Sequence, residues 1–557
     1  MKISAFVLAG LLLLTASALP AAQSAAKQPA AKKAPAAAAK PQTAAAQDPM
    51  VAHLRKLGGS VEFDPKQRGQ IVKVDLGNTA ATDNDLQALK NMKNLRWLSL
   101  WSTHVTDAGL KSLRGLSALE WLDLGRTQVG DEGLETISGL TALKTLTLFN
   151  TRITDEGLVH LKPLVNLEEL HLSDAAITGD GLENLSGLKK LQSLHLFRTR
   201  LRDDALGHLA KLTSLEMLDL GATHVTDQGL ASLADLKKLE TLSLKHTEVT
   251  GAGLKELAGL RELKTLDLGF TPLTGDGLAG IDSLTSLTTL HLTDTQIDDD
   301  GLAAVGRLEN LRSLDLGLTT IGDEGVSHLS GLKGLEELTL IGTQVTDDGL
   351  KALEELVYLN ALVLAGDEIS DDGLAHLAGL TRLLHLDLRH TRVSGDGLSH
   401  LKKMENLESL DLADTHVGDR ALGHLKPLAK LIELNLFNTR VTDEGLKQLG
   451  DLNHLKLLVL ANTRIADEGL VHVGKFASLQ ELSLQATKIT DQGLAHLKGL
   501  KHLNALSLQS TRITDAGLKH LAGLAELHSL NVADTRVTEA GIGQLRNKLP
   551  QLRVLSH

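Results

Sequence analysis

The sequence is dominated by one segment that recurs every 24 residues, without a single insertion, from Thr79 to Thr535. A threonine marks the period most clearly, and we refer to it as the repeat threonine. Twenty units follow one another in phase; 18 keep the threonine, and the other two carry Ala175 and Asp367 in its place. Constant length with varying side chains indicates a solenoid in which each unit packs on its two neighbours.

The unit at residues 95–118, LRWLSLWSTHVTDAGLKSLRGLSA, shows what each repeat forms. Alternating leucines predict a short strand, Thr106 and Asp107 supply an N-cap oxygen, and leucines at near-helical spacing predict an apolar stripe on a helix. These leucines are Leu95, Leu98 and Leu100 in the strand and Leu110, Leu113 and Leu116 in the helix. One unit cannot bury them, so neighbouring units must. Because helices are wider than strands, the stack should curve with its strands inside.

Each unit reads L-x-x-L-x-L-x-x-T-x-V/I-T-D-x-G-L-x-x-L-x-x-L-x-x and resembles the leucine-rich repeat, with threonine where that family has Asn or Cys. The ITDxGL continuation is most similar to the cysteine-containing, F-box-associated subtype, which also occurs in exported bacterial proteins. The resemblance covers roughly residues 71 to 555. It implies an α/β solenoid, namely a right-handed leucine-rich-repeat horseshoe with parallel β-strands on the concave face and helices on the convex face.

The first 48 residues differ in composition from the repeats. Lys2 precedes an apolar run at residues 5–14 and then small residues, so residues 1–22 are predicted to be a secretory signal. An uncleaved anchor is the alternative. Residues 23–48 form an Ala/Pro/Lys-rich tract that we expect to be a disordered linker. We therefore expect an exported protein, periplasmic or extracellular, with no membrane span after signal cleavage.

Both ends of the repeat array depart from the pattern. Residues 49–70 are predicted to form an N-terminal cap, with a helix over Val51–Leu57 and a strand through Val61 and Phe63. About twenty repeats then occupy residues 71–546. A C-terminal cap is predicted at residues 547–557, since Pro550 ends the last helix and three apolar residues are read as out of step with the period. These three residues are Leu549, Leu552 and Val554.

Charge and cysteine content exclude several classes of function. The net charge is -12, and residues 49–557 carry 52 basic against 68 acidic side chains. An acidic chain argues against nucleic acid or an anionic membrane as the main partner. The chain has no cysteine, which excludes disulfides, thiol catalysis and a lipoprotein anchor. We expect a monomer without a metal or cofactor.

Aromatic residues point to a candidate binding surface. Side chains six, four and two residues before each repeat threonine should project from the concave face. Five of the 11 aromatic residues occupy such positions in neighbouring units, where no core requires them: Trp97, Trp101, Trp121, Phe149 and Phe197. Exposed, clustered aromatics are typical of binding hot spots. In the alternative interpretation, the aromatics aligned with Trp101 lie flat and cover neighbouring strands.

Polar residues four positions before the threonine complete this surface. His171, His195 and Asp219 fall on successive strands about 5 Å apart and are predicted to contact a ligand as solvated polar groups. Adjacent imidazoles sharing a metal are the alternative. A catalytic triad does not fit, because Asp219 would stand between His195 and Ser243, whereas the histidine must contact both partners.

An acidic residue also recurs four positions after the repeat threonine, as aspartate in 15 units. Each of these residues opens a helix, and we interpret them as capping groups that favour the helix dipole, in preference to a calcium-binding edge.

These observations predict a non-enzymatic binding or scaffold protein whose concave surface recognises a protein or a cell-envelope polymer outside the cytoplasm, with no catalytic residues. One alternative is a substrate adaptor of the F-box type, without an F-box. The other is a polysaccharide-active enzyme using concave carboxylates such as Asp219 and Asp267. No sequence feature sets one carboxylate apart as a general acid.

Overall fold

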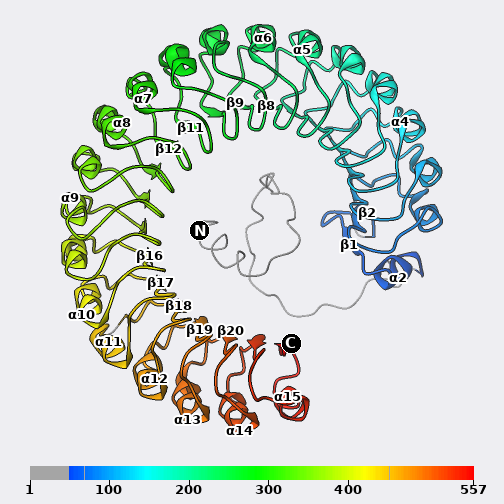
Figure 1. Ribbon diagram of the computed structural model, residues 1–557. Coiled ribbons are helices and arrows are strands. Elements are labelled where there is room, and N and C mark those ends of the chain that lie inside the picture. Colours follow the sequence, from blue (N-terminus) through cyan, green and yellow to red (C-terminus); the bar gives the residue numbers. More distant parts are fainter. Residues whose placement is uncertain (1–48, 68, 451, 557) are drawn as a thin grey trace.

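The computed structural model describes residues 49–67, 69–450 and 452–556. The chain winds into an open, curved solenoid whose strands line the inner circumference and whose helices form the outer one (Figure 1). All the strands in these described ranges belong to one 22-stranded sheet. The predicted α/β solenoid, with a concave parallel sheet and convex helices, is confirmed. The predicted signal (1–22) and linker (23–48) lie outside the described residues.

The sheet begins with one antiparallel pair and is parallel thereafter. Strand β1 (Ser60–Phe63) runs antiparallel to β2 (Ile71–Asp75), and β2 pairs in parallel with β3. Each later strand pairs with the next at an offset of 24 residues, as in Leu98 opposite Leu122. The remaining strands are β3 (Trp97–Ser99), β4 (Trp121–Asp123), β5 (Thr145–Thr147), β6 (Glu169–His171), β7 (Ser193–His195), β8 (Met217–Asp219), β9 (Thr241–Ser243), β10 (Thr265–Asp267), β11 (Thr289–His291), β12 (Ser313–Asp315), β13 (Glu337–Thr339), β14 (Ala361–Val363), β15 (His385–Asp387), β16 (Ser409–Asp411), β17 (Glu433–Asn435), β18 (Leu457–Val459), β19 (Glu481–Ser483), β20 (Ala505–Ser507), β21 (Ser529–Asn531) and β22 (Arg553–Leu555).

The convex segments are short and mix α-helix with 3₁₀-helix. The α-helices are α2 (Pro49–Lys56), α3 (Asp107–Leu110), α4 (Asp131–Ile137), α5 (Asp203–Leu209), α6 (Asp227–Leu230), α7 (Asp299–Val305), α8 (Asp323–Ser327), α9 (Leu374–Leu377), α10 (Asp419–Leu422), α11 (Asp443–Gln448), α12 (Asp467–Val473), α13 (Asp491–Leu494), α14 (Asp515–Leu518) and α15 (Glu539–Arg546). The 3₁₀-helices are η3 (Asp85–Leu89), η4 (Lys111–Leu113), η5 (Asp155–Leu161), η6 (Asp180–Leu185), η7 (Ala231–Leu233), η8 (Leu254–Gly259), η9 (Asp276–Ser283), η10 (His328–Gly331), η11 (Gly349–Leu353), η12 (Asp396–Lys403), η13 (Gly423–Leu425), η14 (Ala495–Gly499) and η15 (Lys519–Leu521). No helix in the described part of the chain is both long and apolar enough to cross a membrane.

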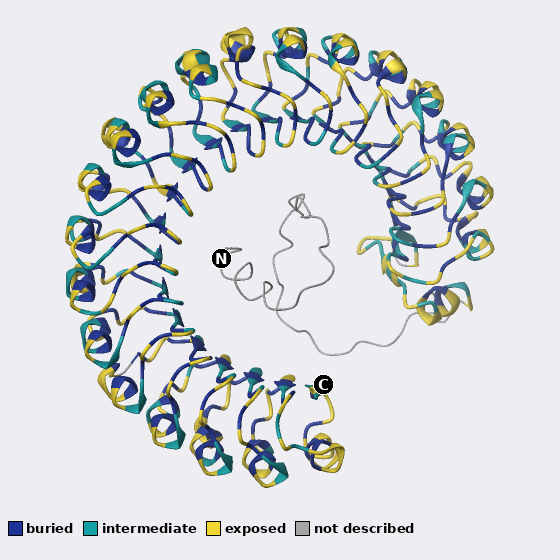
Figure 2. Cartoon of the chain, in the orientation of Figure 1, coloured by how far each residue is buried: buried dark blue, intermediate teal, exposed yellow. Residues whose placement is uncertain are grey.

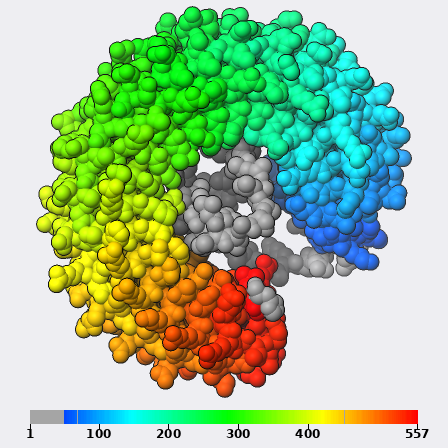
Figure 3. All heavy atoms as spheres, in the orientation of Figure 1, coloured from blue at the N-terminus to red at the C-terminus, as the bar shows by residue number. Residues whose placement is uncertain are grey.

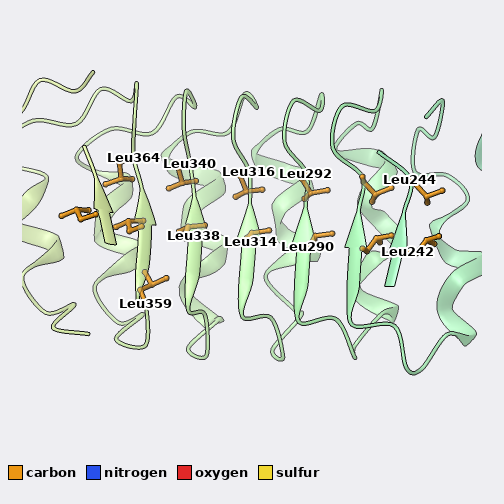
Figure 4. Close-up of a cluster of buried hydrophobic side chains, with 14 of the residues drawn as sticks. Leu242, Leu244, Leu290, Leu292, Leu314, Leu316, Leu338, Leu340, Leu359 and Leu364 are labelled. Atoms are coloured by element: carbon orange, nitrogen blue, oxygen red, sulfur yellow. The ribbon is translucent and has the colours of Figure 1, made fainter. Parts of the chain in front are cut away.

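Leucine side chains fill the space between the sheet and the helices. Leu290, Leu314 and Leu338 form one row behind the strands, and Leu292 and Leu316 belong to a second row beside it (Figure 4). All of them are buried, and the buried residues follow the whole arc (Figure 2). The space-filling view shows the same continuous body around the curve (Figure 3). The core is therefore one extended layer, in which each repeat covers the leucines of the next.

The repeat threonine closes each strand. In most units its hydroxyl donates a hydrogen bond to the carbonyl three residues earlier, as from the buried Thr103 to Leu100 at 2.7 Å. The residue just before it has a left-handed backbone in all twenty units, with φ between 50° and 59° wherever it is not glycine. This tight turn sends the chain from the inner face toward the convex side.

The aspartates four positions after the repeat threonine have a role that the sequence did not indicate. The N-cap of α3 is Thr106, whose Oγ1 accepts a bond from Ala108 N, whereas the Asp107 carboxylate accepts one from Gly130 N in the next repeat. Likewise Asp131 accepts bonds from both the backbone N and the Oγ1 of Thr154, at 2.9 and 2.7 Å. The interpretation of these aspartates mainly as caps for their own helices is therefore wrong. They join consecutive repeats, and we call them the bridging aspartates.

The last strand corrects one detail of the predicted C-terminal cap. Val554 lies opposite Leu530 in the parallel pair of β21 and β22, at the regular offset of 24 residues. Reading Val554 as out of step was therefore wrong, because β22 continues the sheet in register. Leu549 and Leu552 do precede it out of step, after α15.

Candidate ligand-binding face

The first two tryptophans on the inner face stack on each other. Trp97 on β3 lies opposite Trp121 on β4, with ring centroids 4.2 Å apart and planes 5° from parallel. Residues in register on adjacent parallel strands are about 4.8 Å apart, which is close enough for two rings on the same face to stack. Both side chains are partly exposed, and Lys73 Nζ lies 4.3 Å from the Trp97 ring. The pair offers an apolar platform next to a cation.

Trp101 lies differently, flat along the sheet. A Cβ atom on Gly125, one strand away, would collide with the Trp101 ring, and the ring stacks on Phe149, two strands away, at 5.4 Å. Phe197 covers Gly221 in the same way, at 2.8 Å from where a Cβ would stand. The column two residues before the threonine thus alternates large and small side chains. For Trp101 and Phe197 the geometry favours the covering interpretation.

The two histidines predicted to be neighbours do lie together. His171 on β6 and His195 on β7 stack with ring centroids 4.0 Å apart and planes 7° from parallel. The carboxylate beside them is Glu169, whose Oε1 is hydrogen-bonded to His171 Nε2 at 2.7 Å. His195 Nε2 is hydrogen-bonded to Ser193 Oγ at 3.0 Å. Sequence reasoning had grouped Asp219 with the histidines and had missed Glu169.

Burial controls the ionisation of this cluster. Burial, together with the neighbouring His171, lowers the pKa of His195 to about 3, so its imidazole is neutral near pH 7. The hydrogen bond from His171 lowers the pKa of Glu169, which keeps that carboxylate ionised. The cluster therefore presents a neutral imidazole, a second imidazole and a carboxylate on one face of two strands.

Asp219 has a largely structural environment. Its Oδ1 accepts a hydrogen bond from Gly221 N at 2.9 Å, and burial raises its pKa. Asp267, the other carboxylate considered for an enzyme, accepts the same bond from Gly269 N at 3.0 Å. This bond fixes the chain where each strand ends. It accounts for aspartate at these positions without a catalytic role.

Two concave carboxylates have pKa values that the sequence did not reveal. Burial raises the pKa of Asp123 to about 6, and burial next to Asp411 raises that of Asp387 to about 7. Asp123 is nevertheless bonded to Gly125 N, and Asp387 forms an ion pair with Arg389 at 3.0 Å. Both groups thus have partners within their own repeat, which also gives them a structural role.

One aromatic pair at the rim of the inner face was missed. Phe270 is 41% exposed and stacks on His246 at 4.3 Å. Phe270 occupies the left-handed position before a repeat threonine, with φ of 59°. A large apolar residue is costly there and exposed to solvent. The signal was present in the sequence, because this position otherwise carries mostly small or polar residues.

Family models for leucine-rich repeats match the repeated region. "Leucine-rich repeat region" matches residues 194–423, "Leucine rich repeat" matches 93–153, and "Leucine Rich repeat" matches 164–186, 428–450 and 499–522. These descriptions do not distinguish the cysteine-containing subtype, which stays a prediction. No curated protein matches the sequence significantly.

Several solved structures are similar to this chain. A complex of TLR13 with ssRNA13 has a TM-score of 0.52 and 18% identity, over 87% of this chain and 84% of that chain. An internalin, InlF, from Listeria monocytogenes has 26% identity and a TM-score of 0.47, over 59% of this chain and 88% of that chain. A leucine-rich-repeat protein of Leptospira interrogans has 20% identity and a TM-score of 0.42, over 85% and 99%. The TLR13 similarity supports the fold.

Proposed function

Because this chain is a leucine-rich-repeat protein, we propose that it is a non-enzymatic binding protein that recognises a protein partner with its inner face, outside the cytoplasm. One observation carries the proposal: Trp97 and Trp121 form a partly exposed stack on β3 and β4. The buried leucine rows already supply the core behind these strands. A cluster of large aromatic side chains in contact with solvent is typical of a binding hot spot that a partner covers.

The surroundings of the stack suit a protein surface. Lys73 borders Trp97, and the Arg126 guanidinium lies 5.4 Å from the Trp101 ring and 5.7 Å from the Phe149 ring. Aromatics next to cations combine apolar contact with cation–π and ionic interactions, the combination enriched at protein interfaces. An envelope glycan could also stack on the tryptophans, and it is the second outcome that the experiment distinguishes.

The double substitution Trp97→Ala and Trp121→Ala is expected to weaken partner binding by about 100-fold or more, since hot-spot aromatics contribute about 2 kcal/mol or more each. Partners are captured from a cell-envelope extract on the immobilised protein. They are identified by mass spectrometry for proteins and by sugar analysis for glycans, and each affinity is then measured with purified material.

Tyr358→Ala is the matched control. Tyr358 is 49% exposed but lies between η11 and β14, away from the inner strands, where it contacts Arg382. This control should bind like the original chain. Equal binding by the original chain and the tryptophan double variant, or a loss explained by unfolding in circular dichroism, would contradict the proposal.

Location outside the cytoplasm rests on the predicted signal at residues 1–22. Residues 1–48 fused to alkaline phosphatase, which needs disulfides to become active, should give an active enzyme in a Gram-negative host. The same fusion lacking residues 1–22 should be inactive. Activity that is absent from both fusions, or equal in both, would refute export by this segment.

A further inference from the structure

We propose that Glu169, His171 and His195 form a binding site for a borderline divalent transition metal ion, with Zn²⁺ as the representative, on the inner face at β6 and β7. The inference is independent of the proposed partner, because it concerns only groups that the chain itself supplies.

The three side chains converge on one region. One donor atom from each lies within 4.8 Å of the other two, and no other group of three such side chains meets this condition among the described residues. His171 Nε2 and His195 Nε2 both point back along their strands, toward Glu169 and Ser193, two residues earlier. Because β6 and β7 are parallel and in register, Glu169 lies opposite Ser193 and His171 lies opposite His195. The two imidazole nitrogens therefore face the same region as the carboxylate.

The donor separations are close to those of a tetrahedral ion, although the two stacked imidazoles must rotate out of their parallel arrangement for both Nε2 atoms to point at it. Zinc binds imidazole nitrogen at about 2.0–2.1 Å and carboxylate oxygen at about 2.0–2.2 Å, which places the donors roughly 3.3 Å apart. The Glu169 and His171 donors are now 2.7 Å apart and would separate slightly.

The donor types select the class of ion. Two imidazole nitrogens and one carboxylate oxygen favour Zn²⁺ and its neighbours, whereas Ca²⁺ and Mg²⁺ prefer oxygen ligands alone. Three protein ligands leave one coordination position open to water or to a group from a bound partner.

A hydrogen-bonded cluster without an ion is the competing explanation. It accounts for the pairing of Glu169 with His171 and of Ser193 with His195. It predicts no measurable affinity for zinc, so metal titration separates the two explanations.

Zinc titration of the full chain, after treatment with a chelator, tests the site. Isothermal titration calorimetry is expected to show a single zinc ion per chain with a dissociation constant in the micromolar range or tighter, and zinc should raise the unfolding temperature. Calcium and magnesium at the same concentration should do neither. No zinc uptake, or equal uptake of calcium, would overturn the proposal.

Variants locate the ion. His195→Ala and Glu169→Gln are expected to weaken zinc binding at least tenfold. Glu169→Gln nearly keeps the side-chain shape and guards against a folding defect. The control is His291→Ala, on β11 in the same column, where the neighbouring strands present Asp267 and Asp315 instead of a histidine. It should bind zinc like the original chain. Unchanged binding in His195→Ala and Glu169→Gln, or an equal loss in His291→Ala, would place the zinc elsewhere and refute the site.

Discussion

Replacing Gly445 with alanine is expected to destabilise the solenoid by about 1–3 kcal/mol, although alanine is the better helix former. Gly445 lies in α11, where an added Cβ would stand 2.5 Å from Oδ1 of the bridging aspartate Asp419. That carboxylate cannot swing away freely, because it accepts bonds from Thr442 N at 2.7 Å and from Thr442 Oγ1 at 2.8 Å. Urea denaturation followed by circular dichroism measures the loss.

The chain itself contains the compensating change. Glycine replaces the bridging aspartate in four units, and in two of them, at Gly179 and Gly395, the facing position of the next repeat carries alanine, namely Ala205 and Ala421. Opposite the other two glycines the facing position keeps glycine, so alanine occurs there only where the aspartate is absent. Adding Asp419→Gly to Gly445→Ala should therefore recover at least about 1 kcal/mol relative to the sum of the single substitutions. Ala421→Gly is the control and should cost less than about 1 kcal/mol. Additive effects of the two substitutions would show that a clash between the Asp419 carboxylate and the alanine Cβ is not the cause of the destabilisation.

Asp367→Thr is expected to stabilise the protein by about 2–4 kcal/mol at pH 8. Asp367 stands where 18 of the twenty units have the repeat threonine, and it is only 3% exposed. Its Oδ1 accepts bonds from Thr343 N and Oγ1, but its Oδ2 is buried without a hydrogen-bond partner among the described residues. Threonine removes this group and supplies the hydroxyl that, in most other units, donates to the carbonyl three residues earlier. Denaturation midpoints in urea provide the measurement.

The gain should depend on pH with a definite sign. Burial raises the pKa of Asp367 to about 7 in the folded chain, against 3.8 in the unfolded chain. Between these values the folded state binds the extra proton, so its stability falls as pH rises from about 4 to 7. The gain from Asp367→Thr should therefore be smaller at pH 4 and reach its full size above pH 7. Asp367→Asn cannot ionise at this position, so the free energy of unfolding of this variant should also lose this fall between about pH 4 and 7. A gain that does not change with pH would show that ionisation is not the cause.

The fold could be predicted almost completely because its determinants are local and repeated. Leu98 and Leu100 set the strand, and the 24-residue spacing sets its register with Leu122. The hydrogen-bond partners of the bridging aspartates could not be predicted in the same way. Asp107 looks like a first-turn residue in its own repeat, and only the stacking distance shows that its carboxylate reaches Gly130. The sequence reports periodicity, whereas such contacts depend on how closely successive repeats pack.

The sequence predicted which residues of the candidate site lie side by side on neighbouring strands, but not which side chains contact each other. Register alone placed Trp97 beside Trp121 and His171 beside His195. It did not show that the His171 ring turns along its own strand toward Glu169 instead of across the sheet to Asp219, because that depends on side-chain rotamers. Burial raises the pKa of Asp387 for a similar reason, since exposure depends on the neighbouring strands.

The three tryptophans provide the most direct test of the binding face, because all of them, Trp97, Trp101 and Trp121, lie on the inner face of two adjacent repeats. Their emission reports on this surface alone. When the purified partner is titrated into the protein, we expect a saturable shift of tryptophan emission to shorter wavelength and reduced quenching by acrylamide, with the same affinity as calorimetry gives. Binding by calorimetry with unchanged emission and unchanged quenching would place the partner elsewhere and contradict the proposed binding face.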